Sequence, residues 1–191
     1  MLDRQARSGQ PFFSVLLTIS NHPPYIIPPY FHPRSRTTEE QIVEYADWSI
    51  RNFMTEALKR PWADHTLFVL LGDHGKLVGT PECESPQSYN HIPLMIYGRD
   101  IPPRIVDAYG GQVDLAPTLL GLLDISYVQN DFGVDLLKEK RPYMYFTADN
   151  LIGVRDSSRL FLYFPDTQQE IRYRTEARRY RLPRTTRLSA T

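Results

Sequence analysis

Continuous apolar runs dominate the hydrophobic pattern of the chain. The first extends from Phe12 to Ile19 and the second from Thr66 to Leu71, and both are rich in β-branched and aromatic residues. Runs of this length without polar alternation are typical of strands that are buried on both faces of a sheet. A third run, Ile92 to Gly98, has a proline near its start, where a strand tolerates the missing N–H. The pattern therefore predicts buried strands at the first two places and a further strand at the third.

A helical period separates the first two runs. Apolar residues recur there at spacings of three and four, at Ile42, Ala46, Ile50, Phe53 and Ala57. Thr37 and Glu40 precede them at the spacing of a capping box, so a helix is expected over about residues 38–59. A strand, a loop, a helix and a further strand in this order favour a right-handed parallel crossover. A second helix is predicted over residues 113–123, with Pro117 in its first turn.

These elements predict an α/β fold built on a mainly parallel sheet flanked by helices. Two shorter runs, residues 143–146 and 160–164, flank a turn and predict a small C-terminal antiparallel ribbon. Seven arginines between Arg172 and Arg187 lack an apolar period, so the end of the chain is interpreted as solvated and disordered. The expected organisation is one folded domain over residues 1–165 and an arginine-rich tail over residues 166–191.

The composition excludes several classes of protein. Lysine plus arginine and aspartate plus glutamate total 22 each, which argues against general electrostatic capture of nucleic acid or of an anionic membrane. The single cysteine, Cys83, excludes an intramolecular disulfide framework and a multi-cysteine metal site. No apolar stretch approaches the roughly 18 residues that span a bilayer. The N-terminal residues lack the apolar core of a signal peptide. No nucleic-acid partner is expected, and no export or transmembrane signal is found in these residues.

The main candidate for chemistry follows the second apolar run. The motif Gly72-Asp73-His74-Gly75 places a carboxylate and an imidazole at the end of a predicted strand, where open α/β sheets bind ligands. These two groups suit a borderline divalent cation such as Zn²⁺ or Mn²⁺, although such sites usually take three or four protein ligands. From the spacing alone, an ordinary turn with a surface histidine is an equally good interpretation. Another carboxylate, Asp114, is interpreted as the N-cap of the second helix rather than as a catalytic acid.

Several short motifs together resemble those of a known family. The chain is similar to the C-terminal part of a sulfatase-like catalytic domain of the alkaline phosphatase superfamily, and most of all to the lipoteichoic acid synthase and phosphoglycerol transferase group. The motifs occur in the family's order, at residues 11–13, 18–23, 72–75, 91–97, 112–120 and 131–137. The resemblance implies that residues 1–165 are a partial catalytic domain of this type.

The resemblance also implies roles for individual residues. Asp73 and His74 match the family's metal-binding pair, which holds a divalent cation, Mn²⁺ or Zn²⁺, with Ca²⁺ and Mg²⁺ as alternatives. His22 matches a histidine that contacts the substrate phosphate or the leaving group, where an imidazole stabilises charge or donates a proton. A loop histidine bonded to the backbone is the competing interpretation of His22. His91 is a weaker candidate for contact with substrate, and an ordinary histidine is the favoured interpretation there.

The activity implied by the resemblance is metal-dependent transfer or hydrolysis of phosphate, phosphoglycerol or sulfate esters, lipid-linked esters included. The family acts at the extracytoplasmic face of the membrane or in the periplasm. Its nucleophile and an acidic metal ligand lie upstream of the matched part, so an upstream polypeptide is expected to supply them. Thr18 lies inside a predicted strand, and Cys83 lies between two glutamates that disfavour its thiolate. Neither residue therefore fits as the nucleophile.

Two other functions stay open at this point. The chain is alternatively a non-catalytic fragment, truncated or split from a larger protein, and the isolated chain is expected to show low or no turnover. A phosphate-binding regulator that uses the C-terminal arginines is a weaker alternative.

Overall fold

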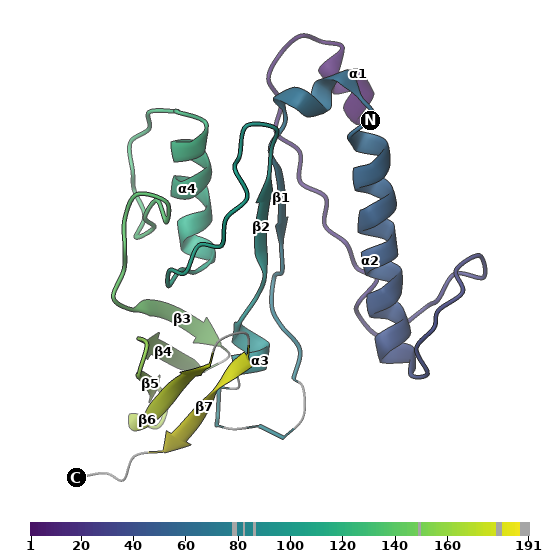
Figure 1. Ribbon diagram of the computed structural model, residues 1–191. Helices are drawn as coiled ribbons and strands as arrows, with labels where there is room; N and C mark the ends of the chain where they lie inside the picture. Colours follow the sequence, from purple (N-terminus) through teal and green to yellow (C-terminus); the bar gives the residue numbers. More distant parts are fainter. Residues whose placement is uncertain (78–79, 82, 86, 149, 179–180, 188–191) are drawn as a thin grey trace. The chain divides into compact units, whose positions relative to one another are not determined.

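The computed structural model of the chain (Figure 1) describes residues 1–77, 80–81, 83–85, 87–148, 150–178 and 181–187. The chain divides into two compact units. Unit 1 comprises Met1–Val69 and Met95–Ile101, and unit 2 comprises Leu70–Leu94 and Pro102–Thr191. Within the described ranges, no helix combines the length and the apolar content needed to cross a bilayer.

Unit 1 is built around one long helix. Its helical elements are α1 (Leu2–Ala6), α2 (Thr38–Ala57) and the 3₁₀ helix η1 (Pro61–His65). The predicted capping box is confirmed, because the Glu40 N–H donates to the Thr37 hydroxyl (3.4 Å) and the Thr37 N–H donates to the Glu40 carboxylate (3.5 Å). The predicted apolar stripe is buried at Ile42 and Ala57.

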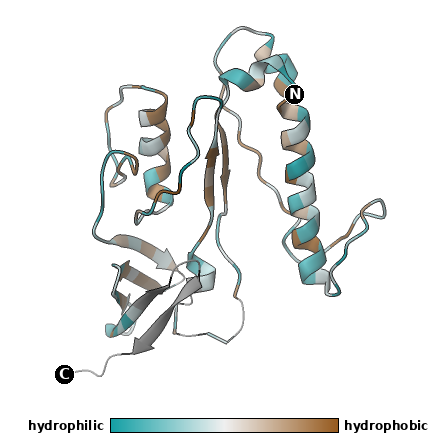
Figure 2. Ribbon diagram, in the orientation of Figure 1, coloured by the Kyte–Doolittle hydropathy of each residue, from teal (hydrophilic) through white to brown (hydrophobic). Residues whose placement is uncertain are grey.

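The first apolar run does not form a strand. Residues 11–19 form neither helix nor strand, and Phe13, Val15 and Leu17 are largely exposed. Figure 2 shows hydrophobic colouring on part of the chain between α1 and α2 as well as on β1 and β2. The prediction of a strand at residues 12–19 was wrong. A β-prone composition indicates that a segment can fit into a sheet, but a strand also requires a neighbouring strand that pairs with it. No described residue supplies that neighbour.

The second and third apolar runs form a two-stranded sheet of β1 (Phe68–Leu71) and β2 (Leu94–Tyr97). Gly72, just after β1, donates its N–H to the carbonyl of Pro93, just before β2 (3.2 Å). Gly98, just after β2, lies against the side chain of Leu67, the residue just before β1. The end of each strand therefore meets the start of the other, so the strands are antiparallel, as Figure 1 shows.

The burial of this pair also differs from the prediction. Phe68 is buried against Ala57 and Ala63 of unit 1, but Leu71 and Met95 are exposed. Both strands are thus confirmed as strands, whereas the predicted burial of β1 on both faces is wrong. The mainly parallel sheet is not found among the described strands, all of which are antiparallel to their neighbours.

Unit 2 contains two helical segments near the Asp-His motif. The short helix α3 (Gln87–Asn90) precedes β2. The predicted helix at 113–123 is present as the 3₁₀ helix η2 (Gln112–Asp114) followed by α4 (Leu115–Leu122). Pro117 lies in the first turn of α4, as predicted, because its missing N–H has no partner to lose there.

The C-terminal part of unit 2 is a five-stranded antiparallel meander in the order β3-β4-β5-β6-β7. The strands are β3 (Met144–Ala148), β4 (Leu151–Arg155), β5 (Arg159–Phe164), β6 (Gln169–Arg178) and β7 (Arg181–Arg187). The predicted ribbon is therefore larger than expected, and its two predicted strands, β3 and β5, pair with β4 rather than with each other.

The expected disordered tail is replaced by β6 and β7 over most of its length. Alternate residues of β6, namely Ile171, Tyr173 and Thr175, are buried, and Ile171 and Tyr173 belong to one core cluster with Leu160 and Leu162 of β5. This period of two was hidden by the intervening arginines, which lie on the opposite face. Residues 179–180 and 188–191 of the expected tail lie outside the described residues.

Candidate functional site

The Asp-His motif forms a tight turn directly after β1. The Gly75 N–H donates to the carbonyl of Tyr89 in α3 (2.7 Å), and the Gly72 N–H donates to the carbonyl of Pro93, just before β2 (3.2 Å). A Cβ atom on Gly75 would overlap the carbonyl oxygen of Ser88, so only glycine allows this close approach between the turn and α3. The backbone on both sides of Asp73 and His74 is therefore fixed to the segment that leads into β2.

The two side chains of the motif face each other. The Oδ2 atom of Asp73 lies 3.8 Å from Nε2 of His74, and the other carboxylate oxygen, Oδ1, accepts the His74 backbone N–H (2.9 Å). The His74 ring stacks on Tyr89, with 5.3 Å between ring centroids and 23° between planes. Both side chains are more than half exposed, at 77% for Asp73 and 55% for His74. The pair is therefore open to a ligand from solvent.

One hydrogen bond sets the tautomer of the neutral His74 ring. Its Nδ1 atom lies 2.7 Å from the carbonyl oxygen of Gly75. A carbonyl oxygen only accepts, so Nδ1 carries the proton in this contact, and the neutral ring keeps its lone pair on Nε2. Histidines that bind metals usually donate their second ring N–H to such an acceptor. His74 is thus arranged to present Nε2 on the side of Asp73.

The donor set fits a divalent cation. In a tetrahedral site with bonds of about 2.1 Å, two ligand atoms lie about 3.4 Å apart, close to the 3.8 Å between Asp73 Oδ2 and His74 Nε2. One oxygen and one neutral nitrogen suit Zn²⁺ or Mn²⁺. Among the residues that the structure describes, no group of three or more histidine, cysteine, aspartate or glutamate side chains is placed to hold a metal ion. A cation at this turn would therefore need donors in addition to Asp73 and His74.

Gln112 holds the same turn from the other side, and the sequence interpretation missed it. Its side-chain amide donates to the carbonyl of Asp73 (2.7 Å) and more weakly to that of Gly72 (3.4 Å). Gln112 is the first residue of η2 and the first residue of the motif at 112–120. Because a glutamine amide contacting a backbone carbonyl leaves no periodic signal, only its membership of that motif pointed to it.

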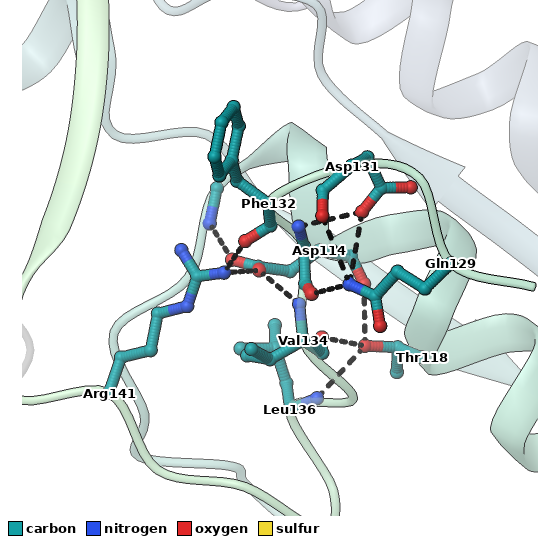
Figure 3. Close-up of polar contacts among 10 residues, drawn as sticks. Asp114, Thr118, Gln129, Asp131, Phe132, Val134, Leu136 and Arg141 are labelled. Carbon is teal, nitrogen blue, oxygen red and sulfur yellow. Dashed lines mark hydrogen bonds and ion pairs between the residues drawn. The ribbon is translucent and has the colours of Figure 1, made fainter.

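Asp114, two residues after Gln112, is the centre of a buried polar network (Figure 3). Its carboxylate accepts N–H groups from Gly111 (2.8 Å) and Val134 (2.8 Å) and pairs with the Arg141 guanidinium (3.0 Å). The Asp114 side chain is 1% exposed and that of Arg141 is 15% exposed. The predicted N-cap contact is not found, because the carboxylate bonds to these groups instead of to the first turn of α4.

The network fastens η2 and α4 to the loop that follows them. The Thr118 hydroxyl donates to the Asp114 carbonyl (2.7 Å) and accepts the Leu136 N–H (3.0 Å). The Asp131 carboxylate accepts the Gly133 N–H (2.7 Å). The side-chain amide of Gln129 donates both to the Asp131 carboxylate and to the Gly133 carbonyl (Figure 3). The loop thus has fixed backbone positions, and these hold η2 at the place from which Gln112 reaches the Asp73 carbonyl.

Replacing Gln112 by alanine is expected to loosen the Asp-His turn without unfolding the chain. A single neutral hydrogen bond contributes about 0.5–1.5 kcal/mol, so amide exchange in the turn should rise about two- to twelvefold. Hydrogen exchange read at residues 72–75 measures this. Gln169→Ala, at an exposed position in β6, is the matched control and should leave exchange in the turn unchanged. Unchanged exchange in Gln112→Ala would show that the amide does not hold the turn.

The other two predicted site residues lie apart from this pair along the chain. His91 is exposed in the segment between α3 and β2, two residues after Tyr89, in the same unit as Asp73 and His74. His22 is exposed in unit 1, and its Nδ1 atom lies 3.0 Å from the Pro23 carbonyl, a backbone contact of the kind expected for an ordinary loop histidine. Asp73 and His74 are therefore the predicted residues that the structure brings together, and the roles of His22 and His91 stay predictions.

The fold is that of the alkaline phosphatase superfamily. A crystal structure of a protein in this superfamily from Vibrio parahaemolyticus matches the whole chain with a TM-score of 0.83 and 25% sequence identity. The match covers 100% of this chain and 47% of that one. The expected superfamily is thereby confirmed, although the mainly parallel arrangement of the sheet is not.

The sulfatase family model matches residues 1–125, and the chain belongs to the sulfatase family. The chain is 27% identical over 178 residues to lipoteichoic acid synthase 2 of Bacillus subtilis, which covers 75% of this chain and 26% of that protein. It is 28% identical over 166 residues to lipoteichoic acid synthase of Staphylococcus saprophyticus, which covers 72% of this chain and 24% of that protein. The chain therefore spans about a quarter of the length of these curated relatives.

Proposed function

We propose that the chain contributes metal-binding residues to a site that transfers or hydrolyses phosphate, phosphoglycerol or sulfate esters within a larger catalytic domain. The observation that carries the proposal is the exposed pair of Asp73 Oδ2 and His74 Nε2, 3.8 Å apart, at a turn fixed on both sides. Membership of the sulfatase family and the similarity to lipoteichoic acid synthases support ester chemistry at phosphorus or sulfur.

The proposed division of roles follows from the chemistry of the side chains. Asp73 and His74 hold a divalent cation, which supplies positive charge to the non-bridging oxygens of the ester. Gln112 and Gly75 keep these ligands in place through the backbone. His22 steadies the phosphoryl group or donates a proton to the leaving alkoxide. The nucleophile comes from an upstream polypeptide, because neither Thr18 nor Cys83 fits that role.

The setting is also part of the proposal. The named activity of the relatives, lipoteichoic acid synthesis, supports a phosphoglycerol donor or acceptor at the extracytoplasmic face of a membrane. We infer a lipid-linked ester as the substrate for the same reason. His91 contacts the substrate in this proposal.

The proposal is tested by phosphorus-31 relaxation of glycerol phosphate in the presence of Mn²⁺ and the chain. A cation held by Asp73 that also meets the ester should shorten the relaxation time beyond the value for Mn²⁺ with Asp73→Asn protein at equal concentrations. Methyl sulfate added as a competitor reports the preference between phosphate and sulfate. Equal relaxation with the wild-type and Asp73→Asn chains would contradict a shared site for cation and ester.

The second candidate is a non-catalytic role for the chain by itself. It is favoured because, among the described residues, no group of three or more histidine, cysteine, aspartate or glutamate side chains could hold a metal ion. Asp73 and His74 are only a pair. We expect the isolated chain to hydrolyse neither a generic phosphodiester nor a generic sulfate ester. Hydrolysis by the isolated chain that is lost in Asp73→Ala would rule out this second candidate and establish that the chain is catalytically sufficient.

A further inference from the structure

The segment that follows the Asp-His turn is anchored to the C-terminal meander. The Tyr173 hydroxyl in β6 donates a hydrogen bond to the Glu84 carboxylate, 89 residues away along the chain. Tyr173 belongs to the core cluster of the sheet and is 3% exposed. Cys83, next to Glu84, packs against the same cluster. Residues 83–85 are therefore held to the meander by a polar and an apolar contact.

A buried contact joins these residues to α3. Ser85, which is 2% exposed, accepts a hydrogen bond on its hydroxyl from the side-chain amide of Asn90, the last residue of α3 (2.7 Å). The Ser85 carbonyl accepts a hydrogen bond from the Cys83 thiol (3.1 Å). α3 also lies beside β7 of the meander (Figure 1). Because a buried hydroxyl has little water with which to replace a lost bond, α3 stays fixed to residues 83–85.

The helix α3 in turn holds the Asp-His turn. Tyr89, adjacent to Asn90, accepts the Gly75 N–H on its carbonyl (2.7 Å), and its ring stacks on the ring of His74. A stacked neighbour fixes the plane of the imidazole, and that plane sets the direction of the Nε2 lone pair. A continuous series of contacts therefore leads from Tyr173 in the sheet, through Tyr89, to the His74 ring.

We propose that Tyr173 is a positioning residue of the pair formed by Asp73 and His74. Its hydroxyl acts through Glu84 and α3, and the bond to the Glu84 carboxylate is charge-assisted, a kind of bond roughly twice as strong as a neutral one. The effect on cation affinity rests on the proposed function, whereas the effect on the His74 ring does not. Loss of a group that orients a metal ligand directly typically lowers affinity about 10- to 100-fold, and Tyr173 lies further out, so we expect a fall of about three- to tenfold.

The experiment uses Tyr173→Phe, which removes the hydroxyl and keeps the ring in the core, and reads the full chain by nuclear magnetic resonance. With carbon-13-labelled histidine and no Mn²⁺, the His74 ring signal reports stacking, because the Tyr89 ring shifts the resonances of protons above its face. In Tyr173→Phe this signal should move toward its position in Tyr89→Ala, where the stack is absent. The Mn²⁺ concentration that half-broadens the amide signals of residues 72–75 should rise about three- to tenfold.

The matched control is Tyr163→Phe in the neighbouring strand β5. The Tyr163 hydroxyl has no hydrogen-bond partner among the described residues, so both readouts should keep their wild-type values. Glu84→Ala, at an exposed residue, should move both readouts in the same direction as Tyr173→Phe. In the Glu84→Ala background, Tyr173→Phe should add nothing, because the two residues form one bond.

An unmoved His74 signal in Tyr173→Phe would overturn the proposal, and so would additive effects of Tyr173→Phe and Glu84→Ala or an equal change in Tyr163→Phe. Failure of the proposed function gives a different result. Residues 72–75 of the wild-type chain would then not broaden with Mn²⁺, while the His74 signal would still move in Tyr173→Phe and support the positioning role. If Tyr173→Phe loses the dispersed amide signals of a folded chain, Glu84→Ala decides by the same His74 signal.

Discussion

Replacing Asp114 by alanine is expected to lower the free energy of unfolding by about 3–5 kcal/mol. The substitution leaves the Arg141 guanidinium, which is 15% exposed, without its carboxylate, and it leaves the N–H groups of Gly111 and Val134 without their acceptor. A charge that is buried and then loses its partner costs far more than the pair contributes when intact. Urea unfolding followed by circular dichroism measures the change.

Two controls sharpen this prediction. Asp107→Ala removes an exposed aspartate from the same unit and should change stability by less than about 0.5 kcal/mol. The double variant Asp114→Ala/Arg141→Leu removes both charges, and it should recover part of the loss because no unpaired charge stays buried. A loss below about 1 kcal/mol in Asp114→Ala would mean that the network in Figure 3 does not organise this part of the chain.

The stability effect has a consequence for the site. Asp114 fixes η2, and η2 carries Gln112, whose amide donates to the Asp73 carbonyl (2.7 Å). We therefore expect Asp114→Ala to disturb the Asp-His turn as well as the loop around Val134. The Gln112→Ala variant, which spares the buried network, separates the local contribution from the global one.

Local signals in the sequence were sufficient for α2, for α4 and for the contact between Asp73 and His74. The side chains of Thr37 and Glu40 form the capping box that begins α2, and these residues are three apart in the sequence. Asp73 and His74 are adjacent in the sequence, so their contact needs no long-range information. The strand type of β1 and β2 was also readable from β-prone composition. The relative direction of β1 and β2 could not be predicted, because the order of elements along the chain does not determine which strands pair with each other.

The misses have a common physical cause in pairing between distant residues. The run from Phe12 to Ile19 has strand composition but no paired neighbour among the described residues, whereas β6 has a buried period of two that its arginines conceal. Arg141 and Gln112 act through partners that are 27 and 39 residues away, at Asp114 and Asp73. Such contacts leave no mark in a window of neighbouring residues.

Substitution of Asp73 by asparagine is expected to weaken cation binding strongly while the fold is kept. The side chain is 77% exposed, and an asparagine oxygen still accepts the His74 backbone N–H that Asp73 Oδ1 accepts now. The change therefore removes the charge and one anionic donor at nearly constant shape. A neutral amide oxygen is a poor ligand for Zn²⁺ or Mn²⁺ compared with a carboxylate, so affinity should fall at least about tenfold. Asp107→Asn, at an exposed aspartate of the same unit, is the matched control and should bind as wild type does.

The most direct measurement is a titration of the nitrogen-15-labelled chain with Mn²⁺, followed by the broadening of backbone amide signals. The account predicts that the signals of residues 72–75 broaden first, that Asp73→Asn removes this broadening, and that Asp107→Asn does not. Paramagnetic broadening detects weak binding, so a site with only two ligands from this chain is still observed. Broadening that begins elsewhere, or that persists at residues 72–75 in Asp73→Asn, would contradict the claim that Asp73 and His74 bind one cation together.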